Sequence, residues 1–173
     1  MRVIFLDIDG VMLPFGSGRE ACDGTFSDVA LAALSRILEE TGAEICLSST
    51  WRCAGGQREI LRQFGEYGRR RPSPLTKIAA HGFKHTTSLT NHTFRQHEIY
   101  AWVIEQQPGK IESWCALDDE ELVSCDEIDG GGEYNARHKP AFAPRAIKTE
   151  SHVGLTDEKA SAAIAALFLP FQT

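Results

Sequence analysis

The feature of this 173-residue chain that most constrains its fold is a set of short apolar segments that end in polar side chains. Residues 3–8 read Val-Ile-Phe-Leu-Asp-Ile, which is strand length and rich in branched and aromatic side chains. Residues 44–48 and 114–119 repeat the pattern and end in Ser48 and in Asp118–Asp119. Segments that are apolar throughout are typical of strands buried on both faces, as in a parallel sheet.

Helical periodicity fills the intervals between these segments. Residues 28–41 repeat leucine at helical spacing, with Ser27 as the N-cap and Gly42 as the C-terminal stop. Strands that alternate with helices predict an α/β fold, with a mostly parallel sheet flanked by helices in three layers. The other predicted elements are helices at 55–66, from Thr93 to Pro108 and after Thr156, a short strand at 146–149, and irregular chain at 67–93 and 129–144.

Length and composition predict a single domain, residues 1–173. A hydrophobic content of 42% supports one sizeable core but not two comfortable ones. No stretch approaches the roughly 18 consecutive apolar residues that a membrane span needs. The five cysteines are odd in number and include no Cys-x-x-Cys pair, so they predict neither a disulfide framework nor a zinc ribbon. We therefore expect a cytoplasmic protein without a membrane partner.

Charge is unevenly distributed along the chain. The net charge is -6, yet residues 52–95 hold nine Lys and Arg against two Asp and Glu. Residues 52–94 are therefore predicted to form a small basic cap or insert within the domain. A basic surface attracts polyanions, which favours a nucleotide or nucleic-acid partner. The run Arg69–Arg71 fits this interpretation, but it fits a merely solvated surface equally well.

The strand-end carboxylates predict a metal site. The carboxyl ends of parallel strands meet at one edge of a sheet, where Asp7, Asp9, Asp118 and Asp119 would converge. Converging carboxylates repel one another unless a cation lies between them, and hard oxygen ligands suit Mg²⁺. Strand alternation would place Asp7 and Asp9 on one side, so that one attacks phosphorus while the other protonates the leaving oxygen. The alternative is a set of solvated carboxylates with no ligand.

The order of these motifs resembles that of the haloacid dehalogenase superfamily. Its four motifs match Asp7-Ile-Asp9-Gly10-Val11, Ile45-Cys-Leu-Ser48, the basic residue Arg95 at a helix start, and Leu117-Asp118-Asp119. Two further segments resemble one branch, the phosphatase-like domains found with RNA-repair proteins: Ser48-Ser-Thr-Trp-Arg52 and Gly154-Leu-Thr-Asp-Glu158. The resemblance implies a magnesium-dependent phosphohydrolase without a large cap.

The resemblance also implies a role for each matching residue. Asp7 would attack the phosphoryl group and form an aspartyl-phosphate, and Asp9 would act as the general acid and then the general base. Ser48 would hydrogen-bond a phosphoryl oxygen, and Arg95 would neutralise its charge. The implied ligands of Mg²⁺ are Asp7, Asp9 through its backbone carbonyl, Asp118 and Asp119.

Four further residues are predicted to contact the substrate: Gly10, Ser49, Arg52 and Lys84. The third motif of the superfamily is more often lysine, so Lys84 is also an alternative to Arg95 as the catalytic cation. Arg95 is favoured because it lies at a predicted helix start, although arginine and lysine are not equivalent. The substrate is predicted to be a phosphate on a nucleotide or a nucleic-acid end.

Several alternatives remain open from the residues. A signalling receiver module also collects acidic residues on a parallel sheet, but its acceptor Asp would follow the middle strand, where this chain has Ser48. An idle relative could bind phosphate or nucleic acid without turnover. Residues 16–21 match a dinucleotide-binding pattern, but turn residues follow them where that pattern requires a helix. The resemblance to the haloacid dehalogenase superfamily implies a flap beside the site here instead. The histidines at 81, 85, 92 and 97 lack the spacing of a zinc site. The oligomeric state is not predicted.

Overall fold

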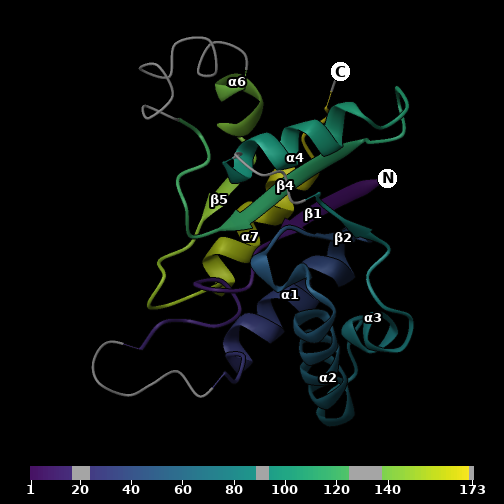
Figure 1. The fold of residues 1–173 in the computed structure, drawn as a ribbon, viewed down its shortest axis with the longest axis vertical. Helices are drawn as coiled ribbons and strands as arrows, with labels where there is room; N and C mark the ends of the chain where they lie inside the picture. The colour runs from purple at the N-terminus through teal and green to yellow at the C-terminus, as the bar shows by residue number, and fades with distance from the viewer. Residues whose placement is uncertain (17–23, 89–93, 125–137, 172–173) are drawn as a thin grey trace.

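The computed structural model describes residues 1–16, 24–88, 94–124 and 138–171. Within these ranges the chain forms a five-stranded parallel sheet with helices on both faces (Figure 1), which confirms the α/β prediction. The strand order is β3-β2-β1-β4-β5. The strands are β1 Arg2–Leu6, β2 Glu44–Leu47, β3 His85–Thr86, β4 Ser113–Asp118 and β5 Ala146–Lys148.

The helices follow the predicted caps closely where those caps are described. Ser27 accepts a hydrogen bond from the backbone N–H of Ala30, and Thr156 accepts one from Lys159, as N-caps should. Gly42 takes the left-handed conformation, with φ 63°, that ends the first helix. The helices are α1 Asp28–Thr41, the 3₁₀ turn η1 Thr50–Arg52, α2 Ala54–Arg70, α3 Leu75–His81, α4 Arg95–Ile104, α6 Lys139–Phe142 and α7 Asp157–Leu167.

Two segments predicted to be irregular are partly helical. Helix α2 runs four residues beyond its predicted end, and α3 follows after a short break, because Tyr67 and Leu75 are buried in the core. Pro74 occupies the N-cap of α3, so it starts a helix instead of interrupting one. Within the other segment predicted to be irregular, 129–144, helix α6 forms and buries Phe142. Tertiary burial overrides local signals at these places.

Helix α4 also differs from its predicted bounds. Its N-cap is Phe94, without a side-chain hydrogen bond, whereas the predicted capping residue Thr93 lies outside the described residues. The helix ends at Ile104, four residues before Pro108.

Two hydrophobic clusters pack on opposite faces of the sheet, as strand alternation requires. Ile4 and Leu6 of β1 face the larger cluster, which includes side chains from α1, α2, α3 and α7. Val3 and Phe5 face the smaller one, with α4 and α6. Helices α2 and α3 both contribute side chains to the larger cluster. The prediction that residues 52–94 form a small cap or insert stays a prediction. None of the described helices has the length and apolar character of a transmembrane span.

Candidate active site

The site lies where the carboxyl ends of three neighbouring strands meet. Leu6 of β1 pairs in register with Leu47 of β2 and Leu117 of β4, so the residues that follow are also neighbours. The backbone N–H of Asp7 donates to the carbonyl of Leu117 at 3.0 Å, and that of Ser48 donates to Leu6 at 2.9 Å. Strands β2 and β3 are added on one side of β1, and β4 and β5 on the other, so the strand order reverses at β1. Ligands of open α/β sheets bind at such switch points.

Three of the four predicted carboxylates form one cluster. Within the part of the chain that the structure describes, Asp7, Asp118 and Asp119 each offer an oxygen within 4.8 Å of the others. Asp7 and Asp118 are buried, and Asp119 is half-buried. Gly10 makes room for this cluster, because a Cβ there would collide with the Asp119 carboxylate, and its φ of +69° disfavours other residues. A cluster of three carboxylates, two of them buried, fits the preference of Mg²⁺ for oxygen ligands.

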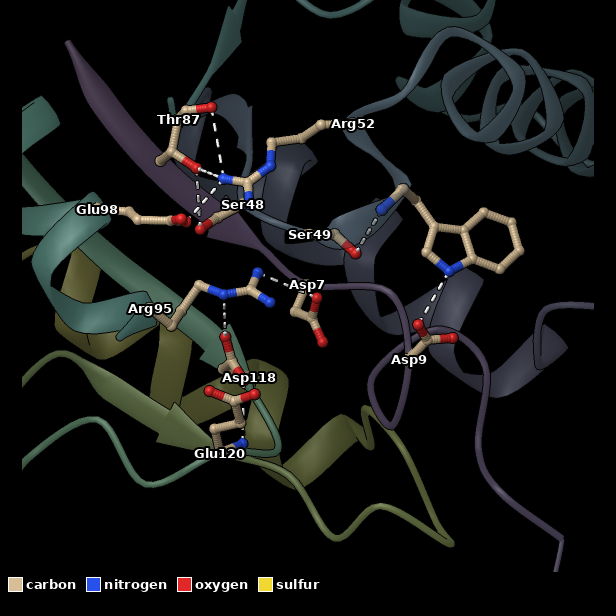
Figure 2. A network of polar contacts seen from close by, with 11 residues as sticks. Asp7, Asp9, Ser48, Ser49, Arg52, Thr87, Arg95, Glu98, Asp118 and Glu120 are labelled. Atoms are coloured by element: carbon tan, nitrogen blue, oxygen red, sulfur yellow. Dashed lines mark hydrogen bonds and ion pairs between the residues drawn. The ribbon is translucent and has the colours of Figure 1, made fainter. Parts of the chain in front are cut away.

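Arg95 supplies the positive charge beside the cluster. It opens α4, and its Nη1 lies 3.2 Å from Oδ1 of Asp7, while its Nε lies 3.9 Å from Oδ2 of Asp118 (Figure 2). Lys84 instead pairs with Glu44 at 2.7 Å, at the amino end of β2 and thus at the opposite edge of the sheet. The structure therefore brings Arg95 to the cluster and does not bring Lys84 there.

One arginine leaves this cluster short of positive charge. Burial raises the pKa of Asp7 to about 6, although Arg95 and a hydrogen bond from Ser49 lower it. Burial raises the pKa of Asp118 to about 7, and the charge of Asp7 raises it further, against the lowering effect of Arg95. The carboxylates thus hold protons more tightly than exposed ones do, which is the condition that a divalent cation would relieve.

These raised pKa values predict an inverse pH dependence of stability for the metal-free protein. In the unfolded chain both carboxyls titrate near pH 4. Between about pH 4 and pH 7 the folded state therefore binds more protons than the unfolded state. The contribution of Asp7 and Asp118 to the free energy of unfolding should fall as the pH rises through that window.

Urea unfolding in excess chelator, at several pH values from 4.5 to 8, measures this contribution. The matched control is the double variant Asp7→Asn/Asp118→Asn, which keeps all other titrating groups. We expect the variant to gain stability relative to the parent as the pH rises. Parallel pH curves for the two proteins would contradict the assigned pKa shifts.

Asp9 lies apart from the carboxylate cluster. Its Oδ2 accepts a hydrogen bond of 3.0 Å from the indole Nε1 of Trp51, and Figure 2 shows the carboxylate turned toward that ring. Strand alternation does not extend to Asp9, because β1 ends at Leu6 and residues 8–13 turn back on themselves through bonds to the Ile8 carbonyl. Its predicted backbone contact to a metal stays a prediction.

The predicted substrate residues after β2 have protein partners. Ser49 is fully buried and caps the turn η1. Arg52 lies near Ser48 (Figure 2), but its Nη1 donates to the Glu98 carboxylate at 2.8 Å. The same nitrogen also donates to the backbone carbonyl and the hydroxyl of Thr87. The Arg52–Glu98 pair is buried, with 6% of each side chain exposed, so it links the end of β2 to α4. Because α4 also carries Arg95, this ion pair supports the position of Arg95. The predicted contact of Arg52 with the substrate stays a prediction.

Two threonines extend the row of polar side chains at this edge of the sheet, and neither was predicted from the sequence to be a site residue. Thr87 follows β3, where its hydroxyl bonds Arg52 and lies 3.4 Å from Oγ of Ser48. Thr149 follows β5, and its hydroxyl donates to the Gly10 carbonyl at 2.8 Å. Strand β3 has only two residues and no apolar pattern, so no local pattern predicts a strand that ends before Thr87. Thr149 ended a predicted strand and could have been found.

The Gly154 motif supports the loop after β1. Gly154 has a φ of +77°, and a Cβ there would lie 2.6 Å from the Val11 carbonyl. The next N–H, of Leu155, donates to the same carbonyl at 2.8 Å. Glycine is thus required for the close approach of two backbones, and the motif stabilises the loop that carries Asp9 and Gly10. Residues 17–23 of the predicted flap lie outside the described residues.

The basic segment is partly neutralised by ion pairs and partly remote from the site. Arg70 pairs with Asp28 at 2.8 Å, and Arg62 pairs with Glu59 and Glu66. The 17 residues of α2 extend for about 25 Å, so Arg69–Arg71 lie at the end of the helix remote from Trp51. Of the four histidines, His85 bonds Glu44, and His92 lies outside the described residues.

Fold and site together define an α/β domain of the haloacid dehalogenase type, with an aspartate cluster at the carboxyl edge of a parallel sheet. A family model described as the HAD domain in Swiss Army Knife RNA repair proteins matches residues 3–160, and the chain belongs to this family. The match supports a phosphohydrolase type of domain and a phosphorylated substrate at the level of the superfamily. No curated protein matches the chain significantly, and neither does any solved structure.

Proposed function

We propose that this protein is a magnesium-dependent phosphatase that acts through an aspartyl-phosphate on Asp7. The observation that carries the proposal is the surrounding of Asp7, which lies beside Asp118 and Asp119 and accepts a hydrogen bond from Arg95. A nucleophilic carboxylate needs a cation and a charge-neutralising donor nearby, because the transferring phosphoryl group is itself negative.

The proposed reaction has two steps. First, a carboxylate oxygen of Asp7 attacks phosphorus, the bond between phosphorus and the leaving oxygen breaks, and Asp9 gives its proton to that oxygen. Next, water attacks the phosphorus, Asp9 takes the proton of that water, and the bond between phosphorus and Asp7 breaks to release phosphate. Ser48, near Asp7 at the end of β2, is proposed to hydrogen-bond a phosphoryl oxygen.

Asp7, Asp118 and Asp119 are the residues proposed to hold Mg²⁺, with the backbone carbonyl of Asp9 as a further ligand. When bound, the ion would neutralise charge on the carboxylates and the phosphoryl oxygens. Arg95 contributes positive charge beside Asp7, with its Nη1 3.2 Å from the Asp7 carboxylate.

For the substrate we propose a phosphate on a nucleotide or a nucleic-acid end. The description of the family, which associates the domain with RNA repair proteins, supports this class. The electrostatic argument is weaker than the sequence alone suggested, because Arg52, Arg70 and Lys84 are paired with acidic side chains from outside the basic segment. An idle phosphate-binding module and a receiver-like acceptor are the alternatives. The cytoplasmic location remains a prediction.

Phosphate release from a panel of nucleotides, sugar phosphates and 3′- or 5′-phosphorylated oligonucleotides tests this proposal. We expect the highest kcat/KM on oligonucleotide ends or nucleotides, together with a phosphoryl adduct on the peptide that contains Asp7 in acid-quenched samples. A stable adduct without phosphate release would indicate a receiver, and neither product with any substrate would indicate an idle module. Equal kcat/KM on sugar phosphates and oligonucleotide ends would contradict the substrate class alone.

A further inference from the structure

We infer that Trp51 is a positioning residue for Asp9, and that its indole N–H holds one carboxylate oxygen so that the other is left for proton transfer. The inference rests on the proposed function, since it concerns the general acid of that reaction. It assigns a role to a residue that lies outside the four motifs.

The contact is built by two segments that the sheet brings together. Asp9 lies in the turn after β1, and Trp51 lies in η1, directly after the end of the neighbouring strand β2. The indole Nε1 donates to Oδ2 of Asp9 at 3.0 Å. Within the described chain, Oδ1 of Asp9 has no protein hydrogen-bond partner.

The orientation of Trp51 is itself fixed by its neighbours. Its backbone N–H donates to Oγ of Ser49 at 3.3 Å, and its ring packs beside Phe26 with centroids 6.1 Å apart. Gly56 has no Cβ, and a Cβ there would press on the Trp51 backbone. The half-buried ring therefore presents its N–H to Asp9 from a defined position, which is what a group that orients a catalytic side chain must do.

An indole suits this task because it is a donor only. It can hold Asp9 in either protonation state, but it cannot take the proton that Asp9 must deliver. The same bond keeps Asp9 separate from the cluster of Asp7, Asp118 and Asp119, where a fourth carboxylate would be drawn to a bound cation. A neutral donor thus preserves a proton-transfer group beside a metal site without adding charge.

This role predicts an effect that depends on the leaving group. An aliphatic alkoxide is a poor leaving group and needs a proton in the transition state, whereas a nitrophenolate leaves readily without one. Disorder of the general acid should therefore slow hydrolysis of alkyl phosphates and have little effect on nitrophenyl phosphate. Loss of packing alone would slow both substrates alike.

The test compares kcat/KM of Trp51→Phe, which keeps an aromatic ring, on p-nitrophenyl phosphate and on a nucleoside or alkyl monophosphate. We expect a loss of about tenfold or more on the alkyl ester and less than about threefold on the aryl ester, since positioned proton transfer contributes about 10²–10⁴-fold. Trp102→Phe is the matched control, because Trp102 packs on the other face of the sheet beside Phe5. It should show no dependence on the leaving group.

A double-mutant cycle makes the test sharper. Asp9→Asn should show the same dependence on the leaving group, with a larger loss of kcat/KM on the alkyl ester. Adding Trp51→Phe to Asp9→Asn should then change kcat/KM on that ester by less than about threefold, because the two residues act as one unit. Equal losses on both substrates, or full additivity with Asp9→Asn, would overturn the role of Trp51 and leave the proposed phosphatase intact. Normal turnover by Asp7→Asn would instead overturn the proposed function.

Discussion

Asp7→Asn is expected to lower kcat on a good phosphate monoester by at least about 10⁴-fold. Where a covalent nucleophile has been removed from an enzyme, losses reach about 10⁶-fold, because the remaining groups cannot replace the missing bond. Asn has nearly the same shape as Asp, so the variant tests the chemistry with little change in packing. Steady-state phosphate release measures the loss, and quenched samples should contain no phosphoryl adduct on this segment.

Folding of the Asp7→Asn protein must be checked separately from its activity. The substitution removes a negative charge from a buried cluster, so we expect the metal-free protein to be at least as stable as the parent at pH 8. Asp28→Asn is a matched control, because Asp28 is exposed and pairs with Arg70 away from the cluster. It should retain full activity. If Asp7→Asn keeps near-normal turnover, Asp7 is not the nucleophile.

Removal of divalent metal is expected to abolish phosphatase activity, and added Mg²⁺ should restore it. Three carboxylates share a space of a few ångströms beside one arginine, and a negative phosphoryl group must enter the same space. Without a further cation, charge repulsion opposes both substrate binding and attack. Activity assayed in excess chelator, followed by titration with Mg²⁺, measures the requirement. Full activity in chelator would exclude the proposed metal role.

Asp118→Asn should raise the Mg²⁺ concentration needed for half-maximal activity by at least about tenfold to 100-fold, since even outer-shell changes weaken metal sites by that much. Glu120→Gln offers a control, because Glu120 is exposed and its hydrogen bond to Asp118 comes from the backbone N–H, which the substitution keeps. Glu120→Gln should leave the titration almost unchanged. An unchanged midpoint for Asp118→Asn would place the metal elsewhere.

Much of the fold followed from local pattern. The helix at 28–41, its Ser27 cap and its Gly42 stop agree with the structure residue for residue, because capping chemistry and leucine spacing act within a few positions. The strands β1, β2 and β4 were also predicted, because a short apolar run is likewise a local signal. The order of polar residues after them also placed Asp7 and Ser48 at one edge, since parallel strands align their carboxyl ends.

What required the tertiary structure were the contacts between segments distant in the chain. Sequence left Arg95 and Lys84 as alternatives, and only the packing of α4 against the sheet brings Arg95 to Asp7, while Lys84 meets Glu44 at the opposite edge.

Strand and helix periodicity are local properties, so the sequence alone predicted which side chains follow β1, β2 and β4. It did not determine where those side chains point. Asp9 turns to Trp51, 42 positions along the chain, and Arg52 is engaged by Glu98, 46 positions away. Such partners depend on register and helix packing across the whole sheet, and no local pattern encodes them.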